Sequence, residues 1–163
     1  MSEGLQEQFR EVMARVATPV SVVTGLADDE TPYGSTVSAF ASLSMEPPMV
    51  LVSLVKSSRL LAVVRQSGRF GLNILGSAHS QLARTFATAL APEEKFTGVD
   101  WAVEAGVPRL TGALSWLGCT VEQEVEGGDH LVLFGSVSSL SSCAGEPLTY
   151  HRRAFGTHTK LEG

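Results

Sequence analysis

The chain has 163 residues, which is enough for one domain with a hydrophobic core and short for two. Hydrophobic residues make up 44% and charged residues 18%, a composition that excludes an intrinsically disordered protein. The formal net charge of −5, with no cluster of Lys and Arg, argues against nucleic-acid binding, and no apolar run reaches the ~20 residues of a membrane span. Because the N-terminal segment is polar and charged, it does not read as a secretory signal. We therefore expect a single cytoplasmic domain over residues 1–163, with no membrane or nucleic-acid partner.

The first expected element is an amphipathic helix. Apolar residues recur at helical spacing on an otherwise charged segment: Leu5, Phe9, Val12, Met13 and Val16. Pro19 ends this pattern. Residues 20–24 then read as a strand, and residues 28–30 as an exposed turn.

The middle of the chain alternates between strand and helix patterns. Residues 34–44 are expected to form one extended segment, which Pro47 and Pro48 end, and residues 49–55 suit a buried strand. Residues 58–66 read as a helix with Ser57 or Ser58 as its N-cap. Its apolar face is formed by Leu60, Leu61, Val63 and Val64. Residues 70–75 read as the next strand.

The second half adds a helix over residues 79–89 and two strands, 114–125 and 131–140. Gly127 and Gly128 lie between these strands, which indicates a hairpin. About six strands joined mostly by hairpins, with short helices between them, predict an antiparallel barrel that carries helices. A parallel α/β sheet remains the alternative, although no G-x-G-x-x-G turn supports it.

Residues 34–44 carry the most informative pattern. Side chains alternate between the two faces of a strand. One face then carries Thr36, Ser38, Phe40, Ser42 and Ser44, and the other carries Ser35, Val37, Ala39, Ala41 and Leu43. The second face is a candidate core face. The hydroxyl-rich first face predicts contact either with a polar ligand or with water.

Three other clusters are candidate binding residues, and each also has an ordinary structural interpretation. Lys56-Ser57-Ser58-Arg59 lies at a helix start, where it suits a phosphate or simply an N-cap. Gly128-Asp129-His130 offers an imidazole beside a turn, either for a ligand or exposed. The arginines of Tyr150-His151-Arg152-Arg153 either pair the phosphates of a dinucleotide or lie on the surface.

Cysteine and histidine spacing excludes a recognisable metal site. Cys119 and Cys143 form no C-x-x-C pair, and the four histidines show no zinc-ligand pattern. We expect both cysteines to be buried free thiols in a reducing compartment. An enzyme with this sequence would therefore need an organic cofactor for electron chemistry.

Taken together, the order and spacing of these segments resemble the flavin reductase-like family. The resemblance covers residues 9–155 and runs through GSTVSAFASLSMEPPMVLVSL, KSSR, RFGLNIL, LARTFA, EEKFTGVDW, GVPRLTGALSWLGCTVEQEVEGGDHLVLFGSV and PLTYHRR. The most specific motifs are the S/T-x-S-x-F-x-S-x-S-x-x-P-P segment and the later G-D-H.

The resemblance implies a mainly β fold, a Greek-key split β-barrel with a few short helices, paired as a homodimer with flavin at or near the interface. By motif, the implied flavin contacts are Thr36, Val37, Ser38, Ser42, Leu43, Ser44, Lys56, Ser57, Ser58, Ala87, Lys95 and Phe96. The implied NAD(P)H contacts are His130, Tyr150, Arg152 and Arg153, with His130 positioning the nicotinamide.

The function implied by the resemblance is an NAD(P)H:flavin oxidoreductase. It would reduce FAD or FMN by hydride transfer and supply free reduced flavin, by diffusion, to a partner monooxygenase of aromatic or natural-product metabolism. NADH and FAD are the expected pair, with NADPH and FMN also open. The alternatives are a flavin-retaining oxidase or reductase of the same fold, a flavin-binding module without turnover, and a general ligand binder.

Overall fold

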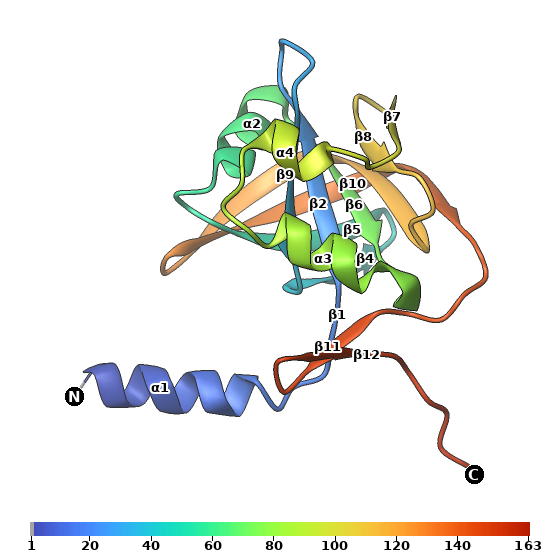
Figure 1. The fold of residues 1–163 in the computed structure, drawn as a ribbon. Coiled ribbons are helices and arrows are strands. Elements are labelled where there is room, and N and C mark those ends of the chain that lie inside the picture. Colours follow the sequence, from blue (N-terminus) through green and yellow to red (C-terminus); the bar gives the residue numbers. More distant parts are fainter. Residues whose placement is uncertain (1) are drawn as a thin grey trace.

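Seven strands form the main sheet of the computed structural model, which describes residues 2–163. Their order across the sheet is β3-β2-β6-β9-β10-β5-β4, and every pairing is antiparallel (Figure 1). The strands are β2 (Ser21–Leu26), β3 (Pro32–Val37), β4 (Phe40–Met45), β5 (Pro48–Val55), β6 (Arg69–Ile74), β9 (Ser115–Gly127) and β10 (His130–Ser142). The mainly β prediction is confirmed, as is the hairpin at Gly127 and Gly128, and the parallel α/β alternative is wrong.

The single strand expected over residues 34–44 is also wrong, because the chain breaks at Ser38 and Ala39. β3 pairs with β2, whereas β4 pairs with β5 at the opposite edge of the sheet order. Since only two residues separate the strands at the two edges, the sheet must curl until those edges approach each other. The Ala39 carbonyl accepts a hydrogen bond of 2.9 Å from the amide of Ser53 on β5, which holds this corner.

The inside of the curled sheet is a hydrophobic core covered at one end by α2 (Arg59–Ser67). Leu60, Leu61 and Val64 of α2 pack there against buried side chains of the strands. Ser58 is the N-cap, as expected, and accepts a hydrogen bond from the Leu61 amide. The left-handed Gly68, with φ 72°, ends the helix.

A second core lies on the outer face of β2 and β3, beneath α3 (Ser80–Phe86) and α4 (Pro92–Phe96). The rings of Phe86 and Phe96 meet edge to face, with centroids 4.9 Å apart. The helix expected over residues 79–89 is shorter at both ends: a 3₁₀ turn, η1 (Ser77–His79), precedes α3, and α3 ends at Phe86 with Ala87 as its C-cap. A hairpin of β7 (Trp101–Glu104) and β8 (Val107–Leu110) borders this core, in which Leu110 is buried.

Segments near the two ends of the chain pair with each other outside the main sheet. β1 (Thr18–Pro19), β11 (Thr149–His151) and β12 (Ala154–Gly156) form a small sheet in the order β1-β11-β12. The expected N-terminal helix is confirmed as α1 (Ser2–Met13), which stands off the body of the molecule (Figure 1). Its apolar stripe faces solvent, with Leu5 70%, Phe9 63% and Val12 61% exposed.

The two cysteines lie in different environments. Cys119 is buried in the inner core, where burial raises the pKa of its thiol to about 12. Cys143 is exposed, so the expectation of two buried thiols is wrong for Cys143, which follows the end of β10 and lies beyond the core. Among residues 2–163, no helix is both long and apolar enough to cross a membrane.

Candidate functional site

Three clefts adjoin one another along residues 35–38, where the two edges of the sheet come together. The first, here the cation cleft, has a volume of about 290 Å³; the second, the central cleft, about 300 Å³; and the third, the aromatic cleft, about 400 Å³. Ser35 lines the first two, and Thr36 and Ser38 line the second and third. One short segment therefore connects all three.

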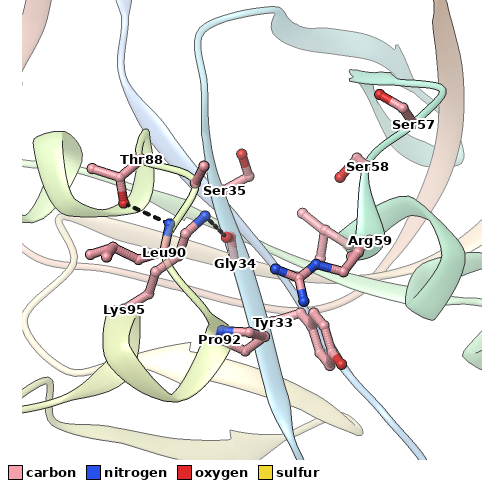
Figure 2. Close-up of a pocket in the computed structure, with 12 residues that line it drawn as sticks. Tyr33, Gly34, Ser35, Ser57, Ser58, Arg59, Thr88, Leu90, Pro92 and Lys95 are labelled. Atoms are coloured by element: carbon pink, nitrogen blue, oxygen red, sulfur yellow. Dashed lines mark hydrogen bonds between the residues drawn. The ribbon is translucent and has the colours of Figure 1, made fainter.

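The cation cleft lies between the start of α2 and the start of α4. Figure 2 shows Arg59 of α2 and Lys95 of α4 approaching it from opposite sides of β3. Lys95 Nζ donates to the carbonyl oxygens of Gly34 and Phe86, both at 3.3 Å. This is possible because Gly34 has no side chain: a Cβ there would lie 2.6 Å from the Phe86 ring. The remaining lining includes the hydroxyls of Ser57, Ser58 and Thr88.

The electrostatics of the cation cleft favour an anion. Burial, and secondly the charge of Arg59, lower the pKa of Lys95. No carboxylate lines the cleft, and within residues 2–163 neither Lys95 nor Arg59 forms an ion pair. The N-terminus of α2 adds a partial positive charge. Two unneutralised cations beside a helix N-terminus and several hydroxyls are the donor set that a phosphate requires.

Lys56 does not belong to this donor set. Its Nζ lies 3.5 Å from Glu126 of β9, and it lines none of the three clefts. The structure thus brings Ser57, Ser58 and Lys95 together as expected, and places Arg59 where Lys56 was expected. Sequence spacing alone gave no sign of this, because Lys56 and Arg59 flank the same pair of serines.

The central cleft contains His130. His130 begins β10 opposite Val55 of β5, and the cleft also contains Val37, Ser53 and Ser58. Its Nδ1 lies 2.7 Å from Asp129 Oδ1. That hydrogen bond is the main reason why the pKa of Asp129 is lowered. With Nδ1–H donating to this carboxylate, a neutral His130 keeps Nε2 as an acceptor for a ligand.

The aromatic cleft lies between α3 and the small sheet. Tyr150 and Phe155 form one wall, with ring centroids 5.1 Å apart, and the Arg84 guanidinium lies 5.2 Å from the centroid of the Phe155 ring. Thr36 Oγ1 donates to the Ala83 carbonyl at 2.6 Å, so its proton is already engaged. The rest of the lining is Val20, Ser38, Ala83, Ala87 and Arg153. Aromatic rings beside guanidinium groups suit a planar aromatic ligand.

Several residues expected to contact flavin lie outside these three clefts. Ser42, Leu43 and Ser44 are on β4, and none of them lines the three clefts, because the chain break sends β4 to the other edge of the sheet. Phe96 is buried in the outer core. Arg152 lines a separate cleft next to α1.

Other lining residues were not found from the sequence. The alternation pattern assigned Ser35 to the core face, but Ser35 is half-buried and lines two of the clefts. Ser53 and Arg84 lie within segments that carry the family resemblance, but neither they nor Phe155 was expected at the site, and only the packing of their elements brings them to the clefts.

Comparison with known proteins agrees with the family resemblance found in the sequence. Residues 13–159 match the model of the flavin reductase like domain. The reductase component of the 4-nitrophenol 4-monooxygenase/4-nitrocatechol 2-monooxygenase of Rhodococcus opacus is 41% identical over 149 residues, which are 91% of this chain and 79% of that protein.

Solved structures share the fold. Nitrilotriacetate monooxygenase component B from Mycobacterium thermoresistibile superposes with a TM-score of 0.91 at 31% identity, covering 100% of this chain and 94% of that one. The NADH:FAD oxidoreductase SgcE6 of Streptomyces globisporus superposes with a TM-score of 0.88 at 29% identity, covering 95% and 94%.

Proposed function

This chain belongs to the flavin reductase-like family, and from that membership we propose that it is an NAD(P)H-dependent flavin reductase that supplies reduced flavin to a separate monooxygenase. Relatives that align with most of its length are named as reductase components of monooxygenases or as an NADH:FAD oxidoreductase. The latter favours NADH and FAD as the preferred pair. Like its relatives, this protein would act on the flavin and leave oxygen chemistry to its partner.

One structural observation carries the assignment. The cation cleft and the aromatic cleft lie at the two ends of the same segment, residues 35–38. A flavin nucleotide has the same layout, with a charged phosphate chain at one end and a planar ring at the other. The donor set of this chain therefore fits a flavin.

The protein's own residues would bind and orient. Arg59, Lys95 and the Ser57 and Ser58 hydroxyls would hold the phosphate. Thr36, Val37, Ser38 and Ala87 would border the ring, and His130, Tyr150 and Arg153 would position the nicotinamide. When bound, the flavin accepts a hydride from NAD(P)H and so supplies the redox chemistry. This division of labour needs no catalytic triad.

The function is tested by steady-state oxidation of NADH and of NADPH with FAD, FMN or riboflavin as acceptor. We expect turnover with free flavin, and the fastest with NADH and FAD. Absence of NAD(P)H oxidation with all three flavins would contradict the proposal. Flavin that copurifies at one per chain and survives dialysis would point instead to a flavin-retaining enzyme.

The phosphate assignment has a sharper test in Arg59→Gln. Loss of one charge-assisted hydrogen bond costs on the order of 1.5–3 kcal/mol, so Kd for FMN and FAD should rise about ten- to hundredfold. Riboflavin, which has no phosphate, should bind as before. Lys56→Gln is the matched control, because Lys56 pairs with Glu126 outside the cleft. Equal weakening of all three flavins by Arg59→Gln would show that Arg59 acts only through stability.

We also propose that the active unit is a homodimer. The apolar face of α1 is exposed in the single chain, although it carries large side chains such as Leu5 and Phe9. A second copy of the chain is the partner that would cover this face, since closed two-fold pairs are the commonest oligomers.

A further inference from the structure

A fourth cleft, of about 290 Å³, lies between the end of α1 and the turn that joins β11 to β12. Its lining residues are Glu11, Ala14, Arg15, Arg152 and Arg153. Arg153 is the residue that this cleft shares with the aromatic cleft. The fourth cleft therefore links the aromatic cleft to α1, a helix that otherwise stands off the body of the molecule (Figure 1).

The β11–β12 hairpin carries one wall of the aromatic cleft and is held against α1 at its turn. Tyr150 and Phe155 are paired across this hairpin. The two-residue turn beyond them is formed by Arg152 and Arg153, with left-handed φ values of 49° and 62°. Asn and Gly normally make such turns, because they adopt that geometry at little cost. The Arg152 amide donates to the Ala14 carbonyl at 2.7 Å, and this contact just after α1 helps to hold the turn.

Glu11 is the carboxylate that holds the Arg153 guanidinium between the two clefts. It accepts a hydrogen bond of 2.6 Å from Arg153, and no other carboxylate lines either cleft. The charged neighbours in these linings are otherwise cationic: Arg84 in the aromatic cleft, and Arg15 and Arg152 in the fourth. Within residues 2–163, none of these three arginines forms an ion pair. Without Glu11, repulsion among the guanidinium groups would favour an Arg153 side chain turned away to solvent.

We propose that Glu11 of α1 is a positioning residue for the flavin reductase reaction, and that it acts through Arg153. The proposal rests on the function argued above, in which Arg153 positions the nicotinamide. The ion pair is exposed, with side-chain accessibilities of 64% for Arg153 and 55% for Glu11, so it contributes little to stability. Its effect is to order the long Arg153 side chain before the coenzyme arrives, which lowers the entropy cost of binding. α1 thereby serves the site without touching the coenzyme.

Glu11→Gln tests this role, because it removes the charge and keeps the shape of the side chain. We expect KM for NADH to rise about two- to tenfold, the effect of leaving one long side chain to be ordered on binding. The calorimetric Kd for NAD+ should rise by the same factor, whereas kcat at saturating NADH, Kd for FAD and the urea midpoint should stay at wild-type values. Glu7→Gln is the matched control, since Glu7 is exposed on the same helix, pairs with Arg10 and lines none of the four clefts.

A double-mutant cycle shows whether Glu11 acts through Arg153. Arg153→Gln should raise KM for NADH at least as much as Glu11→Gln does, and adding Glu11→Gln to it should change KM no further. If the wild type oxidises NADH but Glu11→Gln leaves KM unchanged, the role of Glu11 is overturned and the flavin reductase function stands. The same holds if the rise in KM recurs in full on the Arg153→Gln background. A wild-type protein that oxidises no NADH with any flavin would instead refute the function itself.

Discussion

At the scale of single residues, charged side chains indicate function best where they have no ion-pair partner. Arg65 and Lys56 each pair with a glutamate of β9, and Arg109 pairs with Glu104. Such exposed pairs contribute little and say little about function. Arg59 and Lys95 differ, because they share a partly desolvated cleft without a carboxylate. That arrangement is unfavourable until an anion binds.

The proposed role of His130 in positioning the nicotinamide can be tested by kinetics. His130→Ala should lower kcat/KM for NADH about tenfold, which corresponds to 1.4 kcal/mol, the size of one hydrogen bond to a bound coenzyme. Flavin Kd should stay near the wild-type value. The measurement is stopped-flow reduction of flavin at varied NADH. His151→Ala is the control, since His151 is exposed and lines none of the four clefts. A reduction rate and NADH dependence equal to wild type would show that His130 is only an exposed strand residue.

At the scale of elements, the site depends on two close approaches. Residues 38–39 join the two edges of the sheet, and Gly34 lets β3 pack directly on Phe86 of α3. The same approach brings the Gly34 and Phe86 carbonyls within reach of Lys95. The shape of the cation cleft therefore depends on how three elements pack, and a change in that packing should alter ligand affinity.

Gly34→Ala tests this dependence. The new Cβ would lie 2.6 Å from the ring of Phe86, which is fully buried and has no room to move. Overpacking of this kind costs about 1–3 kcal/mol, measurable as a lower urea midpoint, and it should also weaken FMN binding. Gly127→Ala should change stability by less than about 0.5 kcal/mol, because nothing lies within 4 Å of its added Cβ. Equal stability of the two variants would disprove the tight packing of β3 on α3.

At the scale of the whole molecule, α1 is the element whose apolar face the single chain leaves exposed. Arg153 of the β11–β12 turn pairs with Glu11 of α1, and the Arg152 amide donates to the Ala14 carbonyl just after the helix. The helix otherwise stands off the body of the molecule (Figure 1), and its apolar side chains are exposed. Exposed apolar side chains on one face of a helix are normally covered in the working assembly.

Sedimentation measures the oligomeric state directly. We expect a dimer at micromolar concentration and a monomer for Phe9→Glu, because a buried, unpaired carboxylate is strongly unfavourable. Glu7→Gln, on the same helix but polar and exposed, should remain a dimer. A wild-type monomer with full activity would contradict the proposal.

The sequence by itself determined much of this protein. Periodicity located α1, α2, β5 and the β9–β10 hairpin, because local side-chain pattern and turn chemistry act over a few neighbouring residues. The motif order indicated the family, the mainly β fold and the segments around Ser57, Ser58 and His130. The structure then brought most of the expected residues to three adjoining clefts.

Only the tertiary structure decided which residues those clefts contain. Alternation predicted a continuous hydroxyl face from Thr36 to Ser44, but the break at Ser38 and Ala39 sent β4 to the opposite edge of the sheet. The tertiary structure also placed Arg59, and not Lys56, in the cation cleft. Ser35, Arg84 and Arg15 line clefts, although the sequence did not predict them as site residues. Side-chain periodicity holds only within an unbroken strand or helix. Contacts between elements depend on sheet order and curl, which are set by long-range packing that no local pattern records.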